Sequence, residues 1–244
     1  MKKKFNIFHF SLFLFIGFTC INTNLSESTP IHEEYKDPEQ PIEKRISALL
    51  NSMTLDEKVG QMVMAERRTL LPGDIKKYYI GAVLSGGGSA PAQNNPKAWQ
   101  DMYNVFQNEA LKTRLGIPII YGIDAVHGHS TVIGATVFPH NIGLGATRNG
   151  KLIKRIAKIT AREVKSTGLN WNFGPCVAVT RDERWGRSYE SYGESPEIQK
   201  ILTANYVEGL QQEGIIACAK HFLGDGGAEW LTGEKGTIDR GNIT

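Results

Sequence analysis

The sequence predicts an α/β fold in which short parallel strands alternate with amphipathic helices. Its strand-like runs are apolar throughout instead of alternating with polar residues, which is typical of parallel strands covered on both faces. Between these runs lie segments whose apolar residues recur at helical spacing. A (β/α)8 barrel and an open doubly wound sheet both fit this order. The chain supplies four such strands, which is about half of a (β/α)8 barrel.

The folded part is expected to begin near Pro41 with two helices. The first carries apolar residues at helical spacing, namely Ile42, Ile46, Leu49 and Leu50. Thr54 and Glu57 form a capping box, in which the threonine accepts from the helix N–H groups and the glutamate reaches back. The helix that follows has one apolar face, formed by Leu55, Val59, Met62 and Val63.

Strands and helices then alternate along the rest of the chain. The strands are predicted at residues 80–84, 118–123, 169–173 and 215–219. A helix over residues 97–112 is expected to bury Trp99, Met102, Phe106 and Ala110. A helix over residues 151–165 is expected to bury Leu152, Ile153, Ile156, Ile159 and Val164. Another helix starts at Ser195, where a capping serine, a proline and an acid follow one another, and its apolar face is Ile198, Ile201, Leu202 and Leu210.

Residues 1–20 are predicted to be a signal peptide, because three lysines precede a short apolar segment from Phe5 to Phe18. A membrane anchor is the alternative, but the segment is shorter than the roughly 20 residues that a bilayer span needs. Cys20 is a candidate lipidation site, with simple cleavage as the other outcome. The protein is therefore expected to be periplasmic or secreted, and to contact a membrane only through this signal or a lipid anchor.

The domain organisation follows from the same patterns. Residues 21–40 are polar, carry Pro30 and Pro38, and are expected to form a linker. Residues 41–244 are interpreted as the N-terminal part of a barrel domain that is truncated at Thr244, because four strands do not complete a barrel.

The composition excludes several function classes. Hydrophobic residues make up 41% of the chain and charged residues 22%, as in ordinary globular proteins. The formal net charge is +3, and the three lysines at positions 2–4 account for the whole excess, so no charge pattern for nucleic acid remains. Cys176 and Cys218 lie in apolar runs and are expected to be buried free thiols. No metal site is predicted, because histidine and cysteine do not recur at ligand spacing.

Polar residues gather where the predicted strands end. Asp124 follows the second strand, residues 181–192 follow the third, and Lys220 and His221 follow the fourth. In a parallel barrel these ends form one face, which holds the active site. An acid, a guanidinium, an ammonium and an imidazole on one face suit a ligand with many hydroxyls, because each hydroxyl both donates and accepts. Four aromatic residues are candidates for stacking on a sugar ring: Trp185, Tyr189, Tyr192 and Trp230.

Each of these residues also has a purely structural interpretation. Asp124 could cap a loop, residues 181–184 could be a solvated charge run, and Arg187 could form a structural ion pair with Glu190. His127 and His129 are expected to make hydrogen bonds within their loop instead of binding a metal. The glycine-rich segments 86–88 and 233–237 lack the spacing of a phosphate-binding loop, which argues against a nucleotide enzyme.

Several long motifs resemble the N-terminal domain of the family 3 glycoside hydrolases. They follow one another in a single order, and the likeness runs from about residue 42 to the last residue. The matching segments are Leu55–Met62, Gly122–Gly128, Phe138–Thr147, Arg184–Tyr192 and Ala219–Gly227.

The resemblance implies an incomplete (β/α)8 TIM-like barrel and a β-glucosidase or exo-β-glucanase. Such enzymes are retaining exo-hydrolases that need no cofactor and remove β-D-glucosyl units from the non-reducing ends of β-glucosides or β-glucan oligosaccharides. Carried onto this chain, the residues that bind the terminal glucose are Asp124, Arg187, Lys220 and His221, with Glu234 as a further acidic residue near the site.

The residues that cleave the bond are not found in this sequence. The family's nucleophile is an aspartate in a Ser-Asp-Trp-like motif on a later strand, and its general acid comes from a second domain. Neither has a counterpart here, so no catalytic residue is assigned and the chain alone is expected to be inactive.

Two other functions compete with this one. A β-N-acetylhexosaminidase of the same family would carry an acid/base histidine in the loop after Phe222, but residues 224–230 contain none. A non-catalytic sugar-binding lipoprotein built from the half-barrel would bind glucose without hydrolysing its glycosides.

The adjacent residues Lys220 and His221 predict an irregular backbone at this point of the chain. Adjacent residues of a regular strand point to opposite faces. For both side chains to reach one sugar, the backbone there is expected to carry a bulge or a non-proline cis bond.

Overall fold

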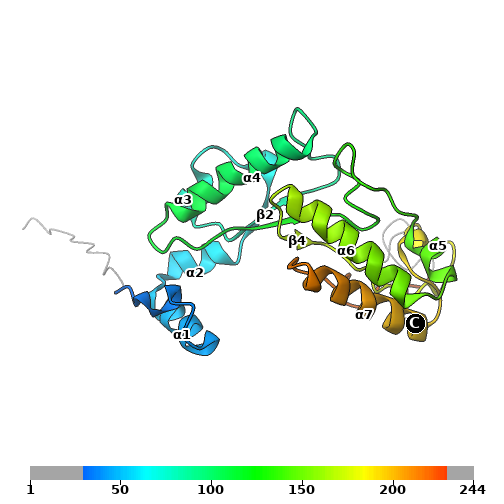
Figure 1. Ribbon diagram of the computed structural model, residues 1–244. Helices are drawn as coiled ribbons and strands as arrows, with labels where there is room; N and C mark the ends of the chain where they lie inside the picture. The colour runs from blue at the N-terminus through cyan, green and yellow to red at the C-terminus, as the bar shows by residue number, and fades with distance from the viewer. Residues whose placement is uncertain (1–29, 230–244) are drawn as a thin grey trace, which may run out of the picture.

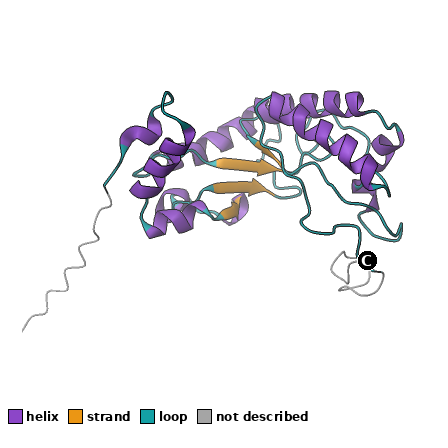
Figure 2. Cartoon of the chain, turned by 90° about the horizontal axis from the view of Figure 1, so that it is seen from below, coloured by secondary structure: helices purple, strands orange, loops and turns teal. Residues whose placement is uncertain are grey.

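The computed structural model describes residues 30–229 and is built around a four-stranded parallel sheet (Figure 1). The strands are β1 Met64–Glu66, β2 Ala82–Ser85, β3 Ile120–Ile123 and β4 Trp171–Asn172. They lie in sequence order, and the arrowheads that can be seen in Figure 2 point the same way. Within the described residues this order never reverses, which favours the wall of a barrel, because a doubly wound sheet reverses at a switch point.

Helices connect the strands and surround the sheet. The α-helices of the described part are α1 Ile42–Ser52, α2 Leu55–Gln61, α3 Asp74–Tyr78, α4 Pro96–Leu111, α5 Asn141–Ala146, α6 Gly150–Ser166 and α7 Pro196–Gln212. Three short 3-10 helices accompany them: η1 Glu33–Lys36, η2 Arg67–Thr69 and η3 Ser188–Glu190. The predicted capping box at the start of α2 and the serine cap of α7 are both present. No helix within residues 30–229 combines the length and apolar character that crossing a bilayer requires.

One face of the sheet is covered and the other is open. Val83 and Tyr121 are cross-strand neighbours that are fully buried, and the ring of Tyr121 lies 5.9 Å from that of Phe106 in α4. The adjacent residues point to the opposite face, because side chains alternate along a strand. There Met64 and Ile120, which both pair with the same residue of β2, are 43% and 39% exposed. Within residues 30–229, helices therefore cover one face of the sheet and part of the other face stays exposed, so the cover on both faces that the apolar strands predict is only partly present.

Some residues of the expected linker contact the fold. Within the expected linker, η1 lies against α1, and the backbone N–H of His32 donates to Ser52 Oγ at 2.8 Å. The hydroxyl of Tyr35 donates to the carbonyl of Leu115 at 2.7 Å. Both contacts reach distant parts of the chain, so His32 and Tyr35, which belong to the expected linker, contact the fold. A polar composition predicts exposure but gives no information about such tertiary contacts.

An ion pair fixes α2 to the segment that precedes β3. Arg114 donates from Nε and Nη2 to the two carboxylate oxygens of Glu57, at 3.0 and 2.6 Å. The Glu57 side chain is 5% exposed. Its burial alone would raise the pKa of Glu57, but the hydrogen bonds from Arg114 and Thr54 outweigh that effect and lower it. The carboxylate therefore stays ionised while it caps the helix and joins two segments.

Several residues expected to face a core are exposed. The apolar faces of α1 and α2 lie open at Ile42, Leu55 and Met62, at one end of the molecule (Figure 1). On α6 and α7 the same holds for Ile159 and Ile201. Four more predicted core residues are exposed: Ile46, Leu50, Val59 and Val63. The prediction is confirmed for Trp99, Ala110, Ile153, Ile156, Val164, Leu202 and Leu210, which are buried, while Met102, Phe106, Leu152 and Ile198 are partly buried. Periodicity identifies an apolar face correctly, but whether another segment covers that face depends on tertiary structure.

Two differences concern the strands. The predicted strand at residues 215–219 is reduced to isolated parallel bridges, Trp171 with Ile216 and Cys176 with Lys220. It still runs alongside the chain after β4, because Ile216 N donates to the carbonyl of Asn170 at 2.9 Å. Strand β1 is not predicted from the sequence, because a run of three residues is too short to show a pattern of apolar and polar residues.

Candidate functional site

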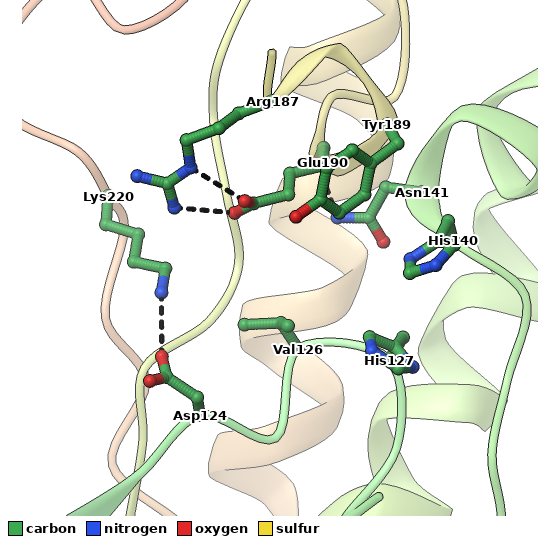
Figure 3. A pocket seen from close by; sticks show the side chains of 9 residues that line it. All are labelled: Asp124, Val126, His127, His140, Asn141, Arg187, Tyr189, Glu190 and Lys220. Carbon is green, nitrogen blue, oxygen red and sulfur yellow. Dashed lines mark hydrogen bonds and ion pairs between the residues drawn. The ribbon is translucent and has the colours of Figure 1, made fainter. Parts of the chain in front are cut away.

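A pocket of about 240 Å³ lies where the carboxyl ends of the strands meet the following loops. Three of the predicted sugar-binding residues, Asp124, Arg187 and Lys220, share it (Figure 3). The rest of its lining is Val126, His127, His140, Asn141, Tyr189 and Glu190. Pockets for drug-sized ligands measure roughly 300–1,000 Å³, so this one suits a smaller molecule.

Asp124 and Lys220 form an ion pair on one side of the pocket (Figure 3). Asp124 directly follows β3, and Lys220 Nζ donates to its Oδ1 at 3.0 Å. The Asp124 side chain is 43% exposed and that of Lys220 is 15% exposed. The other carboxylate oxygen, Oδ2, makes no hydrogen bond within residues 30–229. The alternative in which Asp124 caps its own loop is therefore wrong, and Oδ2 remains available to a ligand.

Arg187 and Glu190 form the ion pair that the sequence left open as a structural alternative. Arg187 Nε and Nη2 donate to the two oxygens of Glu190 at 2.7 and 2.8 Å, a bidentate geometry. These hydrogen bonds raise the pKa of Arg187. Burial would raise the pKa of Glu190, but the contacts from Arg187 outweigh it and lower that pKa. Both groups stay ionised, and the guanidinium is held with its plane fixed at the pocket.

His221 contacts Arg187 but is not among the residues that line the pocket. Its Nε2 is 2.9 Å from Arg187 Nη2, and its Nδ1 is 2.6 Å from Asp225 Oδ2. It borders a neighbouring hollow together with Asp225. The peptide bond between Lys220 and His221 is cis, one of the two distortions that the sequence analysis predicts.

Cys176 is a buried free thiol next to this network. Its Sγ lies 3.4 Å from Glu190 Oε2 and 3.8 Å from His221 Nδ1. Burial, together with the charges of Glu190 and Asp225, raises the pKa of the Cys176 thiol. The same prediction fails for Cys218, which is only partly buried.

The side chains of Cys176, Glu190 and His221 place ligand-type atoms within 4.8 Å of one another, which is a geometry that could hold a metal ion. The donor set does not favour one. Metal binding needs a thiolate, whereas the thiol pKa is raised. Both oxygens of Glu190 already accept from the cationic Arg187.

An aromatic wall of His127, His140 and Tyr189 borders the pocket opposite Lys220 (Figure 3). The two imidazole rings lie 4.6 Å apart, and the ring of His140 lies 4.9 Å from that of Tyr189. Burial, and next the neighbouring His140, lower the pKa of His127. Within residues 30–229, Nδ1 of His127 has no hydrogen-bond partner, whereas Nε2 of His129 lies 3.0 Å from Thr167 Oγ1, outside the loop.

Several other predicted site residues have different positions. Trp185 and Tyr192 are 6% and 2% exposed, so the prediction that they stack on a sugar is wrong. Tyr189 is 44% exposed and does line the pocket. Residues 181–184 are largely exposed, and Arg184 forms an ion pair with Asp182. The interpretation of this segment as a solvated charge run is therefore confirmed. The remaining predictions, Cys20, Trp230 and Glu234, lie outside the described residues.

Two pocket residues are missed by the strand-end rule. His140 and Asn141 follow no strand but stand at the start of α5, and Asn141 Nδ2 donates to the carbonyl of Glu190 at 2.7 Å. The signal that could have identified them is the segment Phe138–Thr147, which matches the family motif. Asp225 is likewise hidden in a turn whose sequence does not indicate that it contacts His221.

A parallel sheet in sequential order, with polar groups from separate loops converging at its carboxyl ends, defines a barrel-type α/β protein with its site on the usual catalytic face. The chain belongs to glycosyl hydrolase family 3, because residues 54–242 match the family model described as "Glycosyl hydrolase family 3 N terminal domain". The TIM-barrel-like α/β fold that the sequence predicts is thereby confirmed.

The chain is similar to enzymes of this family over most of its length. It is 33% identical over 208 residues to the lysosomal β-glucosidase of Dictyostelium discoideum, covering 73% of this chain and 25% of that protein. It is 30% identical over 212 residues to the periplasmic β-glucosidase of Salmonella typhimurium, covering 84% and 26%. The exo-1,3/1,4-β-glucanase of a Pseudoalteromonas species superimposes with a TM-score of 0.74 and 42% identity, over 83% of this chain and 26% of that one. The chain thus spans about a quarter of the length of these relatives.

Proposed function

We propose that this chain contributes the glucose-binding site of an exo-acting retaining β-glucosidase, which hydrolyses terminal non-reducing β-D-glucosyl residues. The observation that carries the proposal is the convergence of Asp124, Lys220 and Arg187 in one small pocket. A carboxylate oxygen accepts a hydroxyl proton, while an ammonium and a guanidinium donate to hydroxyl oxygens. The names of the relatives, β-glucosidase and exo-β-glucanase, support the same substrate class.

Cleavage needs two carboxyl groups roughly 5 Å apart, one of which must be protonated to act as the acid. The carboxylates that line the pocket are unsuitable. The pKa of Glu190 is lowered, and both of its oxygens accept from Arg187. Asp124 is paired with Lys220. We therefore place the nucleophile and the general acid outside residues 30–229, in a longer polypeptide, and we keep Glu234 as a proposed neighbour of the sugar.

The test separates binding from cleavage. The purified 244-residue protein is expected to bind glucose but not to hydrolyse an aryl β-glucoside. Asp124→Asn removes the charge without changing the shape of the side chain. It should raise the Kd for glucose roughly 10- to 100-fold, because a hydrogen bond to a charged group contributes about 1.5–3 kcal/mol. An NMR or calorimetric titration with glucose measures this change.

The matched control is Asp101→Asn, since Asp101 also pairs with a lysine, Lys97, but on the exposed surface of α4. Its affinity for glucose should equal that of the wild type. Equal affinities of the Asp124 and Asp101 variants would argue against the site, and turnover by this chain would overturn the assignment of the catalytic carboxylates.

The proposal extends to location: the protein is exported, as a periplasmic or secreted enzyme, with Cys20 as a candidate lipid attachment site. The charged and apolar order of residues 1–20 supports export, as does the periplasmic relative from Salmonella. Mass spectrometry of the protein purified from its native cells should show a mature N-terminus at or near residue 20. An intact Met1 in that protein would contradict export by this signal.

A further inference from the structure

His221 is fixed from both sides by charged partners. Its Nδ1 lies 2.6 Å from Asp225 Oδ2, and its Nε2 lies 2.9 Å from Arg187 Nη2. The backbone N–H of His221 also donates to Asp225 Oδ2, at 3.3 Å. The side chain of Asp225 is 2% exposed.

These contacts define which ring nitrogen carries the proton. A guanidinium has only donors, so Arg187 Nη2 must donate and His221 Nε2 must offer a lone pair. A neutral imidazole that accepts at Nε2 carries its proton at Nδ1. That proton is directed at the carboxylate of Asp225, which completes the arrangement. The doubly protonated ring and the Nε2–H tautomer would both place an N–H against an N–H of Arg187.

Asp225 is itself held firmly. It lies in the turn after His221, and its carbonyl accepts from Val179 N at 3.2 Å. The next residue, Gly226, has a φ of +81°, and its carbonyl accepts from Arg181 N at 3.1 Å. The segment 177–181 thus supports the turn, and the carboxylate can orient the imidazole without following its movements.

We propose that Asp225 is a positioning residue that holds His221 as the Nδ1–H tautomer, so that His221 Nε2 and Arg187 Nη2 together bind a single sugar hydroxyl. The hydroxyl donates its proton to Nε2 and accepts from Nη2. The ligand thereby replaces one hydrogen bond, between Arg187 and His221, with two of its own. This inference rests on the proposed function. It explains how the site would bind a sugar hydroxyl in preference to a hydrogen atom or a methyl ether at the same position of the sugar.

The chemistry of the pocket explains why the tautomer matters. Lys220 and Arg187 already supply donors, and an Nε2–H tautomer would add another. A hydroxyl bound by donors alone keeps its own proton without a partner, which costs about 1–3 kcal/mol when the group is buried. The neutral Nδ1–H ring supplies the missing acceptor next to the guanidinium.

The experiment reads the tautomer directly and without any sugar. Long-range 1H–15N correlation spectra distinguish Nδ1–H, Nε2–H and doubly protonated imidazoles. The wild-type His221 signals, assigned by their loss in His221→Gln, should show Nδ1–H at pH 7.5. His129 serves as the internal control with the opposite tautomer, because its Nε2 lies 3.0 Å from Thr167 Oγ1, which itself donates to the carbonyl of Val164.

The variant Asp225→Asn should remove the preference of His221 for the Nδ1–H tautomer, because an amide can donate to Nδ1 as readily as accept from it. The corresponding change in serine protease triads produces the wrong tautomer. We expect the His221 signal to shift toward Nε2–H while the His129 signal, which reports a folded protein, is unchanged. Glucose affinity should fall about tenfold, and Asp101→Asn should leave both readouts at their wild-type values.

The outcomes separate this inference from the proposed function. A wild-type His221 that is doubly protonated or in the Nε2–H form overturns the inference, even if the variant does not fold. So does an unchanged tautomer in folded Asp225→Asn, or a changed tautomer with unchanged glucose affinity. If the wild type shows the Nδ1–H form but does not bind glucose, the proposed function fails while the positioning role of Asp225 stands.

Discussion

Gly145→Ala is expected to destabilise the protein by about 3 kcal/mol, the upper end of the usual cost of overpacking, and to weaken the proposed glucose site, although it adds a single methyl group. A Cβ at position 145 would lie 1.7 Å from the carbonyl oxygen of Tyr192 and 2.6 Å from its carbonyl carbon. Both are backbone atoms, so no side-chain rotation can relieve the overlap. Helix α5 must then move away from the segment that follows η3.

The 3-10 helix η3, which directly precedes that segment, holds Arg187 in place through Glu190. Asn141, at the start of α5, donates to the carbonyl of Glu190, whose carboxylate holds the guanidinium. Separating α5 from residues 188–192 should therefore shift Arg187 from the position in which it lines the pocket. Urea denaturation gives the stability, and a glucose titration gives the effect on the site.

Gly143→Ala in the same helix is the matched control. Among the described residues, an added Cβ there would meet nothing closer than Pro139 Cβ at 4.0 Å. Because alanine has a higher helix propensity than glycine, this variant should be as stable as the wild type or up to about 1 kcal/mol more stable. If the two variants had the same stability, the close contact between Gly145 and Tyr192 would not be a determinant of the fold.

The polar side of the site was predictable from the sequence because parallel strands impose it. Asp124 and Lys220 each end an apolar run, and the carboxyl ends of parallel strands meet at one edge of a sheet. Their ion pair joins residues that are 96 positions apart. The ion pair of Arg187 and Glu190 was also predictable from their spacing. The two residues are three positions apart, and a turn of 3-10 helix brings such residues close together.

The depth of each side chain was not predictable, because it depends on segments that are distant in the sequence. Trp185 and Tyr192 stand in a polar loop without any period, and only the tertiary structure shows that they are buried. The reverse holds for Leu55 and Met62, whose helical spacing predicts an apolar face that the described residues leave exposed. His221 is an intermediate case: its sequence position predicts a sugar-binding residue, and the structure places its Nε2 next to Arg187 but does not include it in the lining of the pocket.

The second large effect concerns acid stability and arises from His129. This residue is 1% exposed, lies edge-on to Trp99 of α4, and contacts Thr167 at the end of α6. Its Nδ1 has no hydrogen-bond partner within residues 30–229. A proton at Nδ1 would therefore be buried without an acceptor, and this burial lowers the pKa of His129 to about 4.

The lowered pKa makes folding depend on pH. Below the ordinary value of 6.5 the unfolded chain binds a proton at this histidine, whereas the folded chain does not bind it until the pH approaches 4. The contribution is therefore fully present above about pH 6.5 and is lost as the pH falls from there to about 4. A tenfold difference in proton affinity between the two states corresponds to about 1.4 kcal/mol, so the full loss amounts to about 3 kcal/mol.

His129→Gln isolates this effect, because the glutamine amide can still donate to Thr167 but does not titrate. Urea denaturation of both proteins between pH 7 and pH 4.5 should show that the wild type loses about 2–3 kcal/mol more than the variant over this range. Parallel pH profiles would contradict the assignment to His129. The loop that contains His129 also contains Asp124 and His127, so the protonated histidine would lie in the segment that carries the carboxylate proposed to bind the sugar.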